Sequence, residues 1–207
     1  MGRAPRVDQA DLVYHVLNRA NNRAQIFHSE VDYRDFEYLL TEMCETFSMR
    51  ILAYVIMPNH WHMLLYPSLD GSLSKAMQWL GTSHVRRHHS RFETIGGGHL
   101  YQGRYKSFLV ENDSYLLTVL KYIERNPVRA SLVKAPDAWR WGSAYRRLHG
   151  TAKERALLAE SPVPLPSDYR EWIKYPDPAE EQEKIRDLIR RGEAYGIVTP
   201  KNITPQE

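Results

Sequence analysis

Two histidines, His60 and His62, stand one residue apart in the apolar stretch MPNHWHMLL of residues 57–65. Alternate side chains of a β-strand share one face and lie about 7 Å apart, so both imidazoles project together while Trp61 points to the opposite face. Neutral imidazoles are common metal ligands. The pair is therefore a candidate for half of a metal site, although two polar side chains at a sheet edge would give the same pattern.

A helical segment later in the chain offers a third ligand. In YLLTVLKYIERNP, Tyr122 and Asn126 are four residues apart, which puts a phenol and a side-chain carbonyl on one helix face with about 6 Å of axial rise between them. An amide oxygen and two imidazoles leave coordination positions open on a hard cation such as Mg²⁺ or Mn²⁺, where phosphate oxygens could bind. A zinc site built only from protein ligands is disfavoured because the single cysteine, Cys44, is remote in sequence.

These residue types suit attack on a phosphodiester. A metal ion withdraws charge from a phosphate oxygen, and Tyr122 could then attack in line to give a 5′-phosphotyrosyl link and a free 3′-hydroxyl. A phenol has a reference pKa of about 10, so it needs the metal, a base, or a cation such as Arg125 or Arg129 to gain phenolate character. Tyr115 competes for this role, but Val119 stands four residues after it in place of the amide.

The elements that must position these groups follow from hydrophobic periodicity. Alternating or continuous apolar runs predict strands, and apolar stripes with a period near 3.6 predict helices. The order is β-α-β-β-α-β with one further helix, which predicts an α+β fold with a ferredoxin-like antiparallel sheet covered by helices on one face. The expected strands are 13–18, 51–57, 60–66 and 105–110, and the expected helices are 32–47, 72–91, with Ser72 or Ser74 as its cap, and 114–124.

Composition divides the chain near Gly150. Residues 1–150 hold 19 Lys and Arg against 14 Asp and Glu, whereas residues 151–207 hold 9 against 11. The first part is expected to be the main domain. In the second part, the proline-containing stretches 162–166 and 175–178 predict a linker, and residues 180–195 predict a charged helix.

Cysteine content and hydropathy indicate the compartment. A lone Cys44 cannot form an internal disulfide, which favours a reducing cytoplasm. The longest strongly apolar run, residues 51–57, is far shorter than the roughly 20 residues of a membrane span, and the first residues lack an apolar signal core. We therefore expect a cytoplasmic protein with no membrane contact.

The positive balance of residues 1–150 fits a polyanionic partner, although a solvated helix end would explain the run RRHHSR of residues 86–91 equally well. Basic and amide side chains also precede and follow the helix of Tyr122. The residues expected to contact such a polyanion, which the family resemblance given next implies is DNA, are Arg86, Arg87, Arg91, Gln102, Arg104, Lys106, Arg125 and Arg129.

Two motifs in this order resemble a known family. The sequence HWH at 60–62, preceded by MPN, and the sequence YIERNP at 122–127 resemble the single-tyrosine HUH transposases of the IS200 type. Within that group, the REP-associated tyrosine transposases are the closer match. The resemblance extends from about Tyr14 to Leu148 and includes YQGR at 101–104 and WRWGSAY at 139–145.

The resemblance implies the HUH nuclease fold and a role for each motif residue. It implies that His60 and His62 hold a divalent metal ion, that Asn126 completes the protein ligands, directly or through water, and that Tyr122 is the nucleophile. Many IS200-type enzymes have glutamine at the position of Asn126, and the shorter side chain fits the REP-associated branch. Relatives act as monomers or as homodimers that exchange catalytic helices.

The expected function is that of a metal-dependent, single-strand-specific DNA endonuclease and strand transferase acting on hairpins of repetitive extragenic palindromes (REP). Two alternatives remain open at this point. One is a regulator that binds such hairpins without cutting them, and the other is a metallohydrolase in which water attacks in place of tyrosine.

Overall fold

The computed structural model describes residues 7–110 and 113–191. The strands are β1 (Val13–Arg19), β2 (Met49–Met57), β3 (His60–Pro67) and β4 (Lys106–Val110). The helices are α1 (Glu30–Phe47), α2 (Ser72–Arg91), α3 (Asp113–Glu124), α4 (Asn126–Arg129), α5 (Ser143–His149), α6 (Ala152–Arg155), α7 (Tyr169–Trp172) and α8 (Ala179–Arg191), with short 3₁₀ turns η1 (Asn21–Arg23) and η2 (Pro136–Ala138). No helix in these two ranges combines the length and apolarity that a membrane span requires.

The four strands form one antiparallel sheet in the order β2-β3-β1-β4. This order and the succession β1-α1-β2-β3-α2-β4 confirm the predicted ferredoxin-like α+β fold. The β2-β3 hairpin is also confirmed, because Met57 pairs with His60 across the two-residue turn. The residue before η1 contacts this turn, because the Ala20 N–H donates to the Asn59 carbonyl at 2.9 Å.

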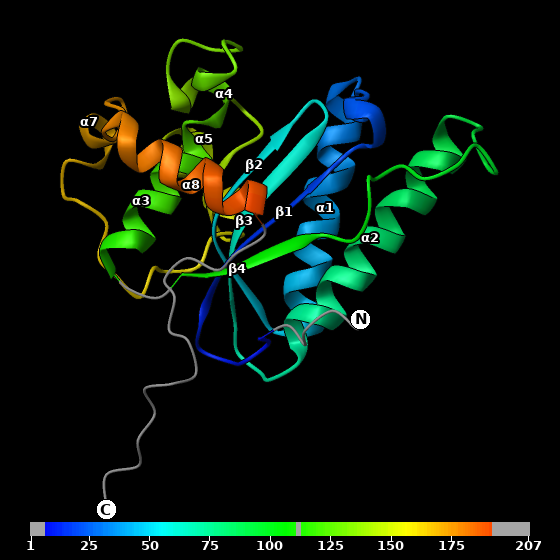
Figure 1. The fold of residues 1–207 in the computed structure, drawn as a ribbon, viewed down its shortest axis with the longest axis horizontal. Helices are drawn as coiled ribbons and strands as arrows, with labels where there is room; N and C mark the ends of the chain where they lie inside the picture. The colour runs from blue at the N-terminus through cyan, green and yellow to red at the C-terminus, as the bar shows by residue number, and fades with distance from the viewer. Residues whose placement is uncertain (1–6, 111–112, 192–207) are drawn as a thin grey trace, which may run out of the picture.

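Helices cover both faces of the sheet, so the expectation of a single covered face was wrong. Helices α1 and α2 pack on one face and α3 and α8 on the other (Figure 1). The physical reason is visible in β2, where residues 51–57 are all buried. A strand buried on both faces reads as a continuous apolar run, as ILAYVIM does, whereas a half-buried strand alternates.

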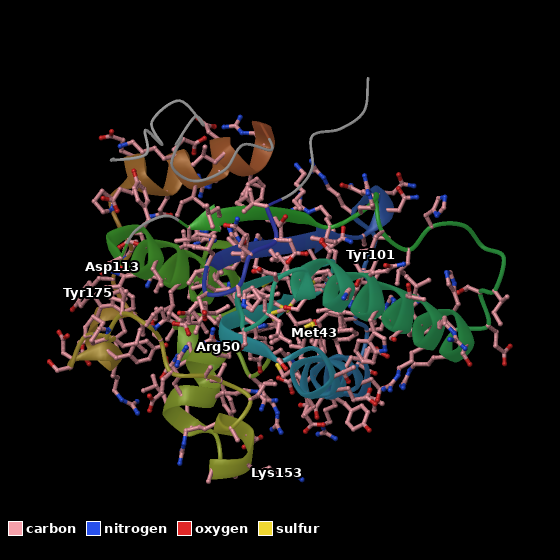
Figure 2. All side chains as sticks on the ribbon, turned by 90° about the horizontal axis from the view of Figure 1, so that it is seen from below. Met43, Arg50, Tyr101, Asp113, Lys153 and Tyr175 are labelled. Carbon is pink, nitrogen blue, oxygen red and sulfur yellow. The ribbon has the colours of Figure 1, made fainter. Side chains whose placement is uncertain are left out.

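The face under α1 and α2 contains the larger core. Trp61 lies there, and its indole N–H donates to the Tyr101 hydroxyl at 2.9 Å. The same hydroxyl lies 2.6 Å from His84 Nδ1 of α2, so two buried polar groups of different elements are satisfied together. Figure 2 labels Tyr101 beside the strands, in the layer next to α2.

The N-terminus of α2 is capped by a residue remote in sequence. Asp8 accepts hydrogen bonds from the backbone N–H groups of Leu73 and Ser74 at 3.1 and 2.8 Å. The helix has the bounds that periodicity predicts, but the expected cap by Ser72 or Ser74 was wrong. A carboxylate at this end also stabilises the helix dipole.

The chain after Gly150 packs on the face that carries α3. Tyr169 and Ile173, in and after α7, and Ile185 of α8 join the apolar cluster of α3, β1 and β2. Helix α8 lies across that side of the sheet (Figure 1), and Lys106 at the start of β4 donates to the Ile189 carbonyl at 2.8 Å. Residues 192–195 of the expected charged helix lie outside the described residues.

Candidate active site

Three histidines share the sheet face that is covered by α3. Residues His60 and His62 open β3, and His15 lies on the neighbouring strand β1. Leu17 pairs with His62 and His15 pairs with Leu64, so His15 and His62 are diagonal neighbours on one face. Their rings are stacked with centroids 5.2 Å apart, and the His60 and His62 rings are also 5.2 Å apart, edge to face.

The Nδ1 atom of each histidine in the pair is engaged in a hydrogen bond. Nδ1 of His60 lies 2.6 Å from the Asn59 side-chain oxygen, which can only accept, so His60 carries its proton there. Nδ1 of His62 lies 2.9 Å from Nε2 of His15. The Nε2 atoms of His60 and His62 are therefore the ones that remain for a metal ion.

Burial keeps these imidazoles neutral. Burial, together with the nearby Arg19 guanidinium, lowers the pKa of His60 to about 4. Burial lowers the pKa of His62 well below its usual value of 6.5, with additional contributions from His15 and His60. Because the neutral imidazole is the form that ligates metals, both residues are ready ligands near pH 7.

Asn126 reaches this pair from the opposite layer. Helix α3 ends at Glu124, and a turn at Arg125 leads into α4, which begins at Asn126 with Pro127 as its next residue. An interaction with the Asn126 side chain raises the pKa of His60 and so opposes the effect of burial. Tyr122 and Asn126 therefore belong to two consecutive helices and do not share the face of one helix.

The Tyr122 ring lies against the histidines of its own chain. Its centroid is 6.2 Å from that of His62 and 6.3 Å from that of His15, with both rings edge to face. The guanidinium carbon of Arg129 lies 3.8 Å from the centroid of the Tyr122 ring, and Arg129 donates to the Tyr122 carbonyl at 2.8 Å. Tyr115 is 39% exposed, whereas Tyr122 is 7% exposed.

The donor set fits a divalent cation with open coordination positions. Two neutral imidazoles and one amide lie together, and the amide contributes a hard oxygen ligand. Among the described residues, no group of three or more His, Cys, Asp and Glu side chains is arranged to hold a metal ion. Two imidazole nitrogens and one amide oxygen would supply three ligands, which leaves positions on an octahedral ion for substrate oxygens.

Residues beside Tyr122 anchor α3 to the later part of the chain. Glu124, whose side chain is fully buried, accepts hydrogen bonds from Ser143 of α5 at 2.6 Å and from Tyr169 of α7 at 2.5 Å. Lys121 pairs with Asp177 at 3.1 Å. These contacts fix the helix that carries the phenol.

Three of the residues expected to contact DNA meet in one groove. Arg86 of α2 and Gln102 and Arg104 of the segment before β4 line an open groove of about 1070 Å³. Asn18 of β1 and Tyr105 line it as well, and none of the lining residues is Asp or Glu. Asn18 pairs with Trp61 and its neighbour Arg19 pairs with His60, so the groove and the histidine pair lie on opposite faces of the sheet at the same end of β1.

Four other basic residues that were expected to contact DNA have partners within the chain. Arg87 pairs with Glu42 at 3.1 Å, and Arg91 pairs with Asp32 at 2.9 Å. Lys106 binds the α8 carbonyl described above. The guanidinium of Arg125 donates to the Ile173 carbonyl at 2.8 Å and also to the Lys174 carbonyl. Of the eight residues expected to contact DNA, Arg129 lies beside Tyr122. Three line the groove: Arg86, Gln102 and Arg104. The other four have partners within the described part of the chain.

Reasoning from the sequence missed His15 and Arg19. Both share the face of Val13 and Leu17 in the alternating strand VYHVLNR, and both lie beside the histidine pair. The available signal was a histidine at an inward position of an apolar strand, the same signal that marked His60 and His62.

Comparisons with known proteins identify the family and the fold. Residues 8–126 match the model of a family described as "Transposase IS200 like". A protein of Haemophilus influenzae named "Putative REP-associated tyrosine transposase" is 25% identical over 127 residues, which cover 56% of this chain and 70% of that protein. A solved structure of a REP-associated tyrosine transposase bound to a REP hairpin matches with a TM-score of 0.54 and 19% identity, over 81% of this chain and 96% of the other. At this identity the structural match shows the fold.

Proposed function

Because the chain belongs to the IS200-like transposase family, we propose that it cuts and rejoins single-stranded DNA beside REP-type hairpins through a 5′-phosphotyrosine on Tyr122. One observation carries the proposal: the Tyr122 ring lies 6.2 Å from the His62 ring of the same chain. A relative of this fold is bound to such a hairpin, which supports DNA of this kind as the substrate.

The reaction moves one phosphoryl group. The Tyr122 hydroxyl oxygen attacks phosphorus and loses its proton, the bond to the 3′ oxygen of the preceding nucleotide breaks, and that oxygen leaves as a protonated 3′-hydroxyl. The DNA downstream of the cut stays on Tyr122 as an aryl phosphodiester. Attack by a 3′-hydroxyl on this ester restores a DNA phosphodiester and the phenol, so joining needs no nucleotide cofactor.

Side chains of the chain itself prepare the attack. Arg129 places a positive charge against the Tyr122 ring, which stabilises negative charge on the phenol as the proton leaves. The buried Glu124, two residues after Tyr122, holds α3 in place through Ser143 and Tyr169.

His60, His62 and Asn126 would hold Mg²⁺ or Mn²⁺. When bound, such an ion supplies Lewis-acid charge withdrawal from an oxygen of the phosphodiester. The hydrogen bonds at both Nδ1 atoms orient the imidazoles for this role.

The groove of Arg86, Gln102 and Arg104 is proposed to contact the DNA. Its two guanidinium groups attract phosphates, and its amide side chains and Tyr105 can bind or stack on unpaired bases. The lining carries no acidic residue, so nothing in it opposes a polyanion.

The test uses hairpin oligonucleotides labelled at the 3′ or the 5′ end, incubated with the full-length protein and Mn²⁺. We expect the 3′ label to become covalently attached to protein and the 5′ label to be released with a free 3′-hydroxyl. Tyr122→Phe should form no adduct, and Tyr115→Phe serves as the matched control that keeps it. An adduct that persists in Tyr122→Phe would refute the proposal, and cleavage without any adduct would select attack by water.

A further inference from the structure

The two ligand histidines differ in what binds their Nδ1 atoms. His60 faces the Asn59 carboxamide oxygen, an acceptor, which settles that Nδ1 carries the proton. His62 faces Nε2 of His15, and an imidazole nitrogen can either donate or accept. The position of the proton between His15 and His62 therefore decides whether His62 can bind a metal.

The proton between His15 and His62 can be bonded to either residue, and only one of these two positions leaves a nitrogen lone pair of His62 that can bind a metal ion. If His15 donated from Nε2, the neutral His62 would carry its own proton on Nε2, and that atom would have no lone pair for a cation. If His62 donates from Nδ1, its Nε2 lone pair is available and His15 carries its proton on Nδ1.

We propose that His15 is a positioning residue that accepts the Nδ1 proton of His62 and thereby fixes His62 as a metal ligand through Nε2. This inference rests on the metal role of His62 in the proposed function. His15 itself does not touch the reacting atoms in this assignment; it acts through His62.

The surroundings of His15 suit a fixed acceptor. The residue has no exposed surface, and its neighbours on paired strands are Leu64 and Phe108. Its ring stacks on His62 with an interplanar angle of 25° and meets the Tyr122 ring edge to face at 6.3 Å. A ring held on several sides cannot turn away from its partner without disturbing the core, so the hydrogen bond is preorganised.

The first test determines which ring nitrogens of His15 and His62 carry protons. Long-range ¹H–¹⁵N correlation spectra of the metal-free, full-length protein at pH 7 should show His62 protonated at Nδ1 and His15 unprotonated at Nε2. A His62 ring protonated at Nε2 would overturn the proposal. This measurement needs no variant and no activity.

The second test measures metal affinity by calorimetric titration with MnCl₂. His15→Phe keeps a ring in the same space but cannot accept a proton, so Mn²⁺ affinity should fall by about 10–100-fold. His15→Gln places an amide oxygen near the same point and should restore most of the affinity. His84→Phe is the matched control, because it removes another buried, hydrogen-bonded imidazole on the opposite face, and it should bind Mn²⁺ as the wild type does.

The outcomes separate this inference from the proposed function. Wild-type affinity in a folded His15→Phe protein would overturn the role of His15 and leave the proposed function standing. Equal losses in His15→Phe and His15→Gln would also overturn it, since the effect would then come from packing. A wild-type protein that binds no Mn²⁺ would contradict the metal site of the proposed function itself.

Discussion

The Tyr122 ring and the His62 ring lie 6.2 Å apart, centroid to centroid, within one chain. The phenol and the imidazole belong to different layers, α3 and β3, and no second subunit is needed to bring them together. A single chain thus holds every group of the proposed site.

This arrangement predicts that two defective proteins cannot repair each other. Tyr122→Phe and His62→Ala remove different parts of one site, so a mixture of the two should form no covalent adduct with hairpin DNA. The measurement is the adduct yield of the mixture after incubation at high protein concentration. Recovery toward a quarter of the wild-type yield would contradict the single-chain site and indicate exchanged helices.

Arg129 is predicted to act on the chemical step. Arg129→Ala removes the charge at 3.8 Å from the Tyr122 ring centroid and should slow adduct formation by about 100-fold, while hairpin binding stays within a few-fold of the wild type. Arg129→Lys keeps a charge but loses the planar stack and should lie between the two. Single-turnover rates at saturating DNA measure this step. Equal rates for Arg129→Ala and the wild type would remove Arg129 from the mechanism.

The groove predicts how DNA binding depends on salt. Arg86→Ala and Arg104→Ala should each lower the slope of log affinity against log salt concentration by about 1, because each removes one phosphate contact. Arg87→Ala is the matched control on the same helix, since Arg87 pairs with Glu42. Fluorescence anisotropy with a labelled hairpin at several salt concentrations gives the slopes. The same slope for the wild type and for both groove variants would place the DNA elsewhere.

Buried His84 predicts a loss of stability in mild acid. Burial lowers the pKa of His84 to about 3, against about 6.5 in the unfolded chain. Between these values the unfolded chain binds a proton that the folded chain does not, so the free energy of unfolding falls as pH falls. From pH 7 to pH 5 this amounts to about 2 kcal/mol for one such histidine.

Urea unfolding at the two pH values measures this loss. His84→Gln should lose less stability than the wild type between pH 7 and pH 5, whereas exposed His99→Gln should lose the same amount. Identical losses for His84→Gln and the wild type would contradict a neutral, buried His84.

The hydrogen bond from Tyr169 to Glu124 predicts that the chain after Gly150 stabilises helix α3, which carries Tyr122. Tyr169→Phe removes a hydrogen bond to the buried Glu124 carboxylate and should lower the free energy of unfolding by about 1–3 kcal/mol. Tyr175→Phe alters a tyrosine that is 67% exposed and should change it by less than about 0.5 kcal/mol. Equal urea midpoints for the two variants would show that this contact contributes nothing.

Much of the fold could be predicted because local pattern and final structure agree. Periodicity gave α2 its bounds Ser72–Arg91, and the short break at residues 58–59 indicated the hairpin that presents His60. The second covered face was missed although ILAYVIM carried its signal, because a continuous apolar run was not interpreted as a strand buried on both sides.

Contacts between residues distant in sequence could not be predicted from pattern. The carbonyls that bind Arg125 lie 48 and 49 residues later, and Asp8 caps a helix that begins more than 60 residues after it. A charged side chain looks the same in sequence whether it faces solvent, DNA or a carbonyl in its own chain. For this reason the sequence could not show which cations have partners within the chain.

Peptide mapping by mass spectrometry tests the central claim most directly. The adduct formed with hairpin DNA and Mn²⁺ is digested with nuclease and protease, and the modified residue is located by fragmentation. We predict a nucleotide phosphate on Tyr122 within the peptide that contains YIERNP. A nucleotide on Tyr115, or on any residue other than Tyr122, would contradict the account.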